Sequence, residues 1–197
     1  MEDRAAVLAE KIWVTKGARF NAHRRLNAKH YSSLTATALM SVYVVFLQLV
    51  PMFLGSAAAG LDERTLSLLT SFLAIAILVL SLLEQGKSYQ LRAERLHMCG
   101  MALNRLYDEL ENERAQVPAV PASLLDDISQ RYHEALRSVP ENHDPIDNDV
   151  FRAQHREHFK VGRLALTRTY VSYYLGTRGL AWLLTVAFPA ATVLWIW

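Results

Sequence analysis

Two uncharged apolar stretches, residues 33–55 and 66–83, constrain the fold of this 197-residue chain more than any other feature. A helix needs roughly 20 apolar residues to cross a hydrocarbon core about 30 Å thick. The first stretch is long enough with some tilt, and the second is just long enough. Only residues 56–65 join them, so the two helices must be antiparallel neighbours. The sequence therefore predicts a transmembrane helical hairpin over residues 33–83.

Composition and cysteine content restrict the class of protein further. Apolar residues make up 52% of the chain, and the net charge of +2 is too small to favour nucleic acid as a partner. No basic run with interleaved aromatic residues occurs, so no direct nucleic-acid binding is expected. The single cysteine, Cys99, cannot form an intramolecular disulfide and fits a reducing compartment. The N-terminus lacks the pattern of a cleaved signal peptide, so the first apolar stretch is expected to act as the insertion signal.

Basic residues are distributed asymmetrically around the two apolar stretches. The segment between the stretches has one, Arg64, and the residues after the second stretch include Lys87, Arg92 and Arg95. Those before the first stretch are Arg4, Lys11, Lys16, Arg19, Arg24, Arg25 and Lys29. Cytoplasmic segments next to membrane spans carry the excess of lysine and arginine. This distribution predicts that the N-terminus and both open ends of the hairpin are cytoplasmic.

Hydroxyl and amide side chains occupy one arc of each predicted span, at about 100° per residue. The arc in the first span contains Ser33, Thr37, Ser41 and Gln48. The arc in the second span contains Ser67, Thr70, Ser71 and Ser81. Such residues either allow close helix packing and hydrogen bonding or line a water-filled lumen. A single hairpin encloses no channel, so the second alternative requires an oligomer.

A regular apolar seam follows the second span. Its members step by three and four residues, as in a coiled coil, and are Leu96, Cys99, Leu103, Leu106 and Leu110. This seam either joins copies of the chain or packs on the N-terminal helix of the same chain. The second span is expected to continue through Gly86 into the seam helix. The N-terminal helix, residues 1–32, is expected to continue into the first span.

Shorter helices are predicted after the seam helix, which ends at the proline-containing segment 117–121. One covers about 123–139, and a loop follows over residues 140–148. Asp149 is the expected N-cap of another helix that ends near Lys160. His155 and His158 lie three residues apart on this helix, but no third ligand accompanies them, so surface histidines are expected and no metal site.

A third uncharged apolar stretch covers residues 179–197. Its tryptophans, Trp182, Trp195 and Trp197, lie near its ends, where indole rings favour the membrane interface, and this favours a third span. Its minimal length and Pro189 favour a re-entrant or interfacial helix, or one packed on the soluble part.

The predicted fold class is an all-α membrane protein. It has a transmembrane helical hairpin, long cytoplasmic helical extensions, a small helical cytoplasmic region and a third C-terminal membrane helix. The expected divisions are a cytoplasmic N-terminal helix, the hairpin, a cytoplasmic helical region and a C-terminal hydrophobic helix, over residues 1–32, 33–83, 84–178 and 179–197. No glycine-rich phosphate loop, nucleophile elbow or pair of catalytic carboxylates occurs, so neither an enzyme nor a cofactor is expected.

The first 115 or so residues resemble one known family. The resemblance rests on the basic N-terminal helix, the hairpin, the Ser81-Leu82-Leu83-Glu84 exit, and the helix that contains Tyr89, Arg92, Leu96, Leu106 and Leu110. These features resemble the SLATT domain, a two-transmembrane effector that associates with SMODS nucleotidyltransferases and SLOG sensors in prokaryotic conflict systems. Glu141-Asn142-His143 followed by Ile146-Asp147 also resembles a turn in one branch of that family.

The resemblance implies an effector in the bacterial inner membrane that oligomerises and permeabilises it after a linked sensor detects phage. It implies a partner such as a nucleotidyltransferase, a SLOG protein or a reverse transcriptase, because the chain has no separate sensor domain. The third apolar stretch departs from the two-span pattern of the family. The alternative function is a non-conducting, membrane-anchored adaptor or scaffold that recruits a cytoplasmic partner through its helices.

Overall fold

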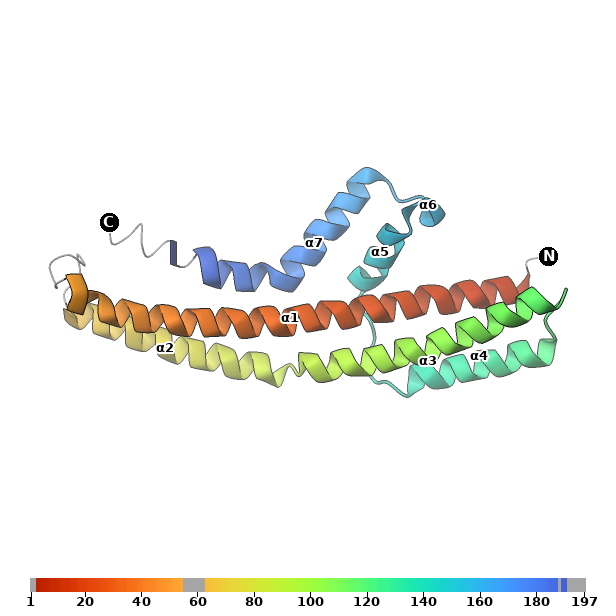
Figure 1. Ribbon diagram of the computed structural model, residues 1–197, viewed down its shortest axis with the longest axis horizontal. Helices are drawn as coiled ribbons and strands as arrows, with labels where there is room; N and C mark the ends of the chain where they lie inside the picture. Colours follow the sequence, from red (N-terminus) through yellow and green to blue (C-terminus); the bar gives the residue numbers. More distant parts are fainter. Residues whose placement is uncertain (1–2, 55–62, 188, 191–197) are drawn as a thin grey trace. The chain divides into compact units, whose positions relative to one another are not determined.

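The computed structural model describes residues 3–54, 63–187 and 189–190, and every regular element within them is helical (Figure 1). The elements are α1 (Arg4–Leu54), α2 (Glu63–Gly86), α3 (Tyr89–Gln116), α4 (Ala122–Arg137), α5 (Pro145–Gln154), α6 (Arg156–Phe159), α7 (Arg163–Trp182) and η2 (Leu183–Ala187). The all-helical fold class is therefore confirmed. Most of the turn that joins the two spans lies outside the described residues.

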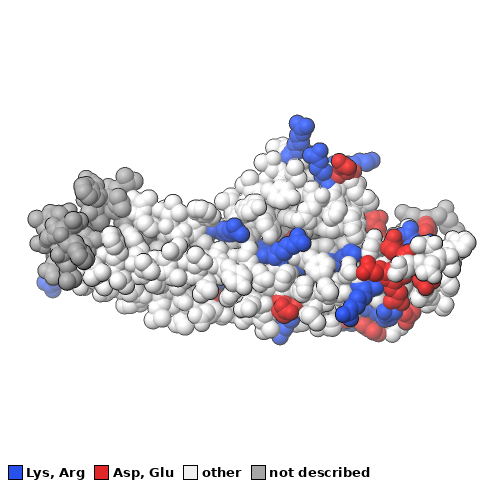
Figure 2. All heavy atoms as spheres, viewed as in Figure 1, with Lys and Arg blue, Asp and Glu red and all other residues white. Residues whose placement is uncertain are grey.

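The chain divides into two compact units. The head unit comprises Met1–Asn27 and Gln90–Tyr173, and the hairpin unit comprises Ala28–Tyr89 and Tyr174–Trp197. On the face drawn in Figure 2, acidic and basic side chains gather over the head unit, whereas the hairpin is nearly free of them. This separation explains why the composition of the whole chain is only mildly hydrophobic.

Helix α1 contributes to both units without interruption over 51 residues. No glycine or proline lies between Lys29 and the apolar stretch, so nothing ends the helix there. The predicted continuation of the N-terminal helix into the first span is confirmed.

The predicted continuation of the second span into the seam helix is wrong. Helix α2 ends at Gly86, and α3 begins at Tyr89. Between them, the amides of Lys87 and Ser88 bond to the carbonyls of Glu84 and Gln85, three residues back, at 3.2 and 3.1 Å. Ser88 has a φ of 47°, which ends a helix. Gly86 weakens the last turn by about 1 kcal/mol relative to alanine, and the local sequence therefore favours termination.

The core of the head unit forms where α1, α3 and α4 pack together. Its fully buried side chains include Ile12 of α1, Leu103 and Leu110 of α3, and Ile128 of α4. Helices α3 and α4 lie side by side in Figure 1. This three-helix packing gives the seam of α3 a partner within its own chain.

The N-cap of α5 is Asp144, in the loop before the helix. The predicted N-cap at Asp149 is therefore wrong. Helix α5 begins at Pro145, and Asp144 and Asp147 form a reciprocal capping box. Proline is favoured at the first helical position because its missing amide would be unpaired there in any case. Asp149 lies inside the helix, and Lys160, with a φ of 51°, follows the end of α6.

Helix α7 begins sixteen residues before the predicted C-terminal helix and passes through Gly179 without a break. It continues into the π-helical turn η2, which precedes Pro189. Proline cannot donate to the carbonyl four residues earlier, and a wider turn is one way to accommodate this loss. Whether the stretch spans a membrane stays a prediction, because residues 188 and 191–197 lie outside the described residues.

A close approach in the head unit gives the first testable prediction. A methyl group added at Gly17 would overlap the ring of Phe151 in α5. We expect Gly17→Ala to destabilise the head unit by about 1–3 kcal/mol, because overpacking displaces either the ring or the helix. Gly179→Ala is the matched control, since its added methyl meets no described atom within 4 Å. Equal thermal unfolding temperatures for the two purified variants would contradict the packing.

Candidate functional site

Apolar side chains form the contact between the two helices of the hairpin. Val44 and Leu47 of α1 and Leu73 of α2 are buried, and Tyr43, Leu69 and Ile77 pack against them. The outer faces are also apolar and are exposed in the monomer, as illustrated by Phe72 at 69%. Large exposed apolar surfaces are unfavourable in water and mark contact with lipid or another protein.

The eight polar residues predicted in the spans fall into two groups. Thr70 is fully buried, and Ser33, Thr37 and Ser81 are half-buried. The exposed group comprises Ser41, Gln48, Ser67 and Ser71. Packing within one hairpin therefore accounts for only part of the polar pattern.

Two hydrogen bonds from these polar residues join the helices of the hairpin, and others stay within one helix. Gln48 Nε2 donates to Thr70 Oγ1 across the helix pair at 3.4 Å, and Ser33 Oγ donates to Glu84 Oε2 at 3.2 Å. Thr37 and Ser41 instead donate to the carbonyls four residues earlier, at 3.0 and 2.9 Å. Hydroxyls that bond to their own helix can face lipid without an unsatisfied donor.

The two polar stripes lie on the same side of the hairpin. Viewed from the open end, successive residues turn clockwise in α1 and anticlockwise in the antiparallel α2. On the helical wheel of each helix, the polar stripe is rotated from the buried contact face by roughly a quarter turn, in the sense in which the chain winds. Because the two helices wind in opposite senses in this view, both rotations lead to the same side of the hairpin. The bond between Gln48 and Thr70 agrees with this placement. The hairpin therefore has one polar side.

The second half of α7 packs on the hairpin away from the exposed polar residues. Tyr31, Thr35 and Leu39 of α1 line a cavity together with Arg178 and Trp182 of α7. These α1 residues precede the buried contact on the helical wheel, whereas the polar stripe follows it. Ser33 and Thr37, near the open end of the polar stripe, line a second cavity with α7. The exposed residues of the stripe, Ser41, Gln48, Ser67 and Ser71, line neither of these two cavities.

The apolar seam of α3 packs inside the head unit. All five of its residues are buried: Leu96, Cys99, Leu103, Leu106 and Leu110. Four of them, from Cys99 onward, share a cluster with Leu8 and Ile12 of α1 and Ile128 of α4. Of the two alternatives for the seam, the structure shows packing on helices of the same chain. The seam surface is therefore already covered by α1 and α4.

Cys99 lies deep in this seam. Its Sγ donates to the carbonyl of Ala135 at 3.4 Å, and burial raises the pKa of the thiol. A raised pKa leaves little thiolate at neutral pH, which is the nucleophilic form. Cys99 therefore acts as a small apolar side chain.

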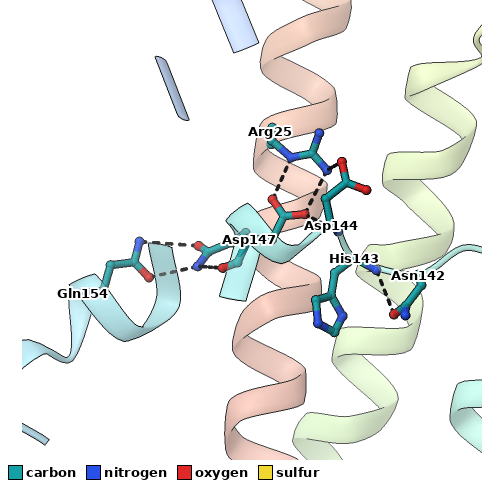
Figure 3. Close-up of polar contacts among 7 residues, drawn as sticks. Arg25, Asn142, His143, Asp144, Asp147 and Gln154 are labelled. Atoms are coloured by element: carbon teal, nitrogen blue, oxygen red, sulfur yellow. Dashed lines mark hydrogen bonds and ion pairs between the residues drawn. The ribbon is translucent and has the colours of Figure 1, made fainter. Parts of the chain in front are cut away.

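A buried ionic group that the sequence did not predict joins α1 to the start of α5 (Figure 3). Arg25 donates from Nε and Nη2 to the two carboxylate oxygens of Asp147, at 2.7 and 2.9 Å. Asp147 is 0% exposed, and the carboxylate of Asp144 lies 2.7 Å from Arg25. Asn21 extends the group through reciprocal bonds with Gln154 at 3.2 and 3.4 Å. We call these five residues the Arg25 cluster.

Charge pairing in the Arg25 cluster overcomes burial. Burial alone lowers the pKa of Arg25, but the hydrogen bond and charge of Asp147, with Asp144 nearby, raise its pKa overall. The pKa of the neighbouring His143 is lowered by burial and by the charge of Arg19, so its ring is neutral at pH 7. The one sequence feature that pointed to the Arg25 cluster is the turn around Glu141–Asp147, which resembles a turn in one branch of the family.

The two histidines considered as metal ligands pack on an aromatic ring instead. His155 and His158 lie edge-on to Trp13, with ring centroids 4.8 and 5.1 Å away. His158 Nε2 also lies 3.3 Å from Glu10 Oε1. Among the described residues no group of three metal-ligating side chains occurs. His158 is exposed and His155 is half-buried, in keeping with the expected surface histidines, but the sequence did not predict the contact of both rings with Trp13.

The fold and the hairpin define a helical membrane protein. The regions of α1 and α2 are long and apolar enough to cross a bilayer, with mean hydropathies of 1.5 and 2.6. Residues 1–194 match a family model described as SMODS and SLOG-associating 2TM effector domain family 5, and the chain belongs to this family. Neither curated proteins nor solved structures gave a significant match.

The extent of the family match corrects one expectation. The resemblance was recognised over about 115 residues, but the match also includes the Arg25 cluster and nearly all of residues 179–197. The third apolar stretch is therefore part of the family pattern and not a departure from it. The family description still counts two membrane spans.

Proposed function

We propose that this protein is a membrane effector of a prokaryotic anti-phage system, whose hairpins assemble through their polar side and permeabilise the inner membrane. The exposure of Ser41, Gln48, Ser67 and Ser71 on one side of the hairpin supports this function. Several copies that direct this side inward would surround a lumen of hydroxyl and amide groups. The apolar outer faces would then contact lipid.

The family description supports the biological setting. It names an effector domain associated with SMODS and SLOG proteins. We propose that a nucleotidyltransferase, a SLOG protein or a reverse transcriptase triggers assembly from the cytoplasm, the side on which the excess of basic N-terminal residues is expected. Because the α3 seam is occupied within the chain, we place self-assembly in the hairpin.

Membrane depolarisation in cells that express the protein with its genomic neighbours tests the function. Replacing Gln48 and Ser71 with leucine removes two polar groups per copy. A hydrogen bond between helices in a membrane contributes about 0.6–2 kcal/mol. We expect Gln48→Leu with Ser71→Leu to lower the depolarisation rate roughly tenfold. Val42→Leu with Ile75→Leu, on the exposed apolar faces, is the matched control.

The adaptor alternative predicts a different result. An adaptor would still support defence while the membrane potential remained unchanged, and the substitutions at Gln48 and Ser71 would have no effect. Purified protein that leaves dye-loaded vesicles intact with every neighbouring gene product would also contradict the proposed function. Membrane insertion of each variant is checked by carbonate extraction, so that loss of insertion is not mistaken for loss of conduction.

A further inference from the structure

A cavity of about 220 Å³ lies within the hairpin unit, at the end of the hairpin opposite the turn. Helices α1, α2 and α7 surround it, and its polar lining includes Lys29, Ser33, Glu84, Lys87 and Thr177. Clefts that hold drug-sized ligands measure roughly 300–1,000 Å³. The cavity is thus suited to a small polar group.

The charges at this cavity favour one negative charge. The charged residues that line the cavity are Lys29, Lys87 and Glu84, so the lining carries one more positive than negative charge. Glu84 is paired with Lys87 and accepts a hydrogen bond from Ser33. The ammonium groups of Lys29 and Lys87 lie 5.9 and 5.7 Å from the ring centroid of Tyr89, which also lines the cavity. A single phosphodiester would balance this excess.

Thr177 provides an independent sign of a missing ligand. It is 7% exposed, and its Oγ1 has no hydrogen-bond partner among the described residues. In the same segment, Thr167 and Thr185 donate to the carbonyls four residues earlier, at 3.1 and 2.7 Å. Buried polar groups are nearly always paired, so an orphaned hydroxyl beside a cavity with charged residues in its lining indicates a bound group or water.

The position of the cavity indicates a lipid as the source of the phosphate. The apolar stretches begin at residue 33 and end at residue 83, so the cavity lies where the spans meet the headgroup region. Leu80 and Leu180, both exposed, also line it and offer apolar surface on the membrane side. Basic pockets between transmembrane helices bind anionic headgroups at this level.

We propose that this cavity binds the phosphodiester headgroup of an anionic phospholipid such as phosphatidylglycerol. The phosphate accepts hydrogen bonds from Lys29 and Lys87, and the headgroup hydroxyls meet Glu84 and Thr177. The acyl chains leave along Leu80 and Leu180. This inference rests on the proposed membrane insertion of the hairpin, and it adds a specific lipid to the proposed function.

Native mass spectrometry of the full chain, released from phosphatidylglycerol–phosphatidylcholine nanodiscs, tests the proposal. We expect one retained phosphatidylglycerol per chain, and Lys29→Gln with Lys87→Gln should weaken retention about tenfold to thirtyfold. Gly176→Leu, which fills the cavity from an open position, should weaken it without changing charge. Lys160→Gln, in the head unit, is the control for charge alone.

Three outcomes would overturn the proposal. In the first, the wild type and both cavity variants retain the lipid equally. In the second, the protein retains phosphatidylglycerol and phosphatidylcholine equally. In the third, soluble glycerol phosphate stabilises the protein as much as phosphatidylglycerol does. Leakage from vesicles of pure phosphatidylcholine would leave the proposed permeabilising function intact while the lipid site failed. Specific retention without leakage under any trigger would show the reverse.

Discussion

Replacing Asp147 with alanine is expected to destabilise the head unit by about 3–5 kcal/mol, because it leaves the charge of Arg25 buried without its bidentate partner. Arg25 is only 6% exposed, so water cannot replace the lost carboxylate. The substitution also removes the acceptor for the backbone amide of Asp144, at 2.9 Å, from the capping box of α5. Amide hydrogen exchange of the full chain in detergent should show the loss as faster exchange in α5.

Two further variants separate charge burial from packing. Asp144→Asn should cost less than Asp147→Ala, because the Asp144 side chain is 54% exposed and is the second partner of Arg25. Arg25→Met combined with Asp147→Leu removes both charges and should recover part of the stability. A change below about 1 kcal/mol in Asp147→Ala would show that water or rearrangement satisfies Arg25, and would contradict the described cluster.

The Arg25 cluster shows what local patterns in this sequence could not predict. Arg25 and Asp147 are 122 residues apart, and neither belongs to a periodic apolar pattern. Arg25 was counted among the basic residues that orient the hairpin, a role that depends only on its position along the chain. The same side chain is paired inside the head unit. Long-range ionic contacts of this kind depend on tertiary packing that no local rule describes.

The hairpin and the α3 seam were predictable because their signals are local. Absence of charge identified the two spans, and steps of three and four residues identified the buried face from Leu96 to Leu110. The same periodicity could not identify the partner of the seam, since a second copy and α1 offer equivalent apolar surfaces. The break after Gly86 was missed because one glycine is tolerated in many helices, and Ser88 gave no further signal for a left-handed conformation.

The polar stripes illustrate a different limit. The helical wheel places four of these residues on one arc of each helix, but burial divides the eight between the helix contact and the open side. That division depends on which face of α2 meets α1, which is set by Val44, Leu47 and Leu73. The alternatives of packing and lumen are therefore not exclusive. Gln48 is compatible with both, because it is exposed and also bonds to Thr70.

Replacing Leu103 with alanine is expected to destabilise the head unit by about 2–5 kcal/mol, because the lost side chain leaves a cavity in a packed core. Leu103 is 0% exposed and contacts a cluster that includes Ile12 and Ile128. Leu91→Ala in the same helix is the matched control, since Leu91 is 53% exposed and should change the stability by less than about 1 kcal/mol. Thermal unfolding of the purified full-length variants in detergent measures both effects.

The same pair of variants distinguishes the two possible roles of the α3 seam. If the seam is intramolecular, Leu103→Ala lowers the unfolding temperature equally at every protein concentration. If it instead joins copies, the variant remains folded while its oligomer dissociates, and its unfolding temperature rises with protein concentration. We expect the first result, because α1 and α4 of the same chain already cover Leu103. If the Leu103→Ala protein were folded but dissociated, the assembly surface would lie in the head unit and not on the polar side of the hairpin.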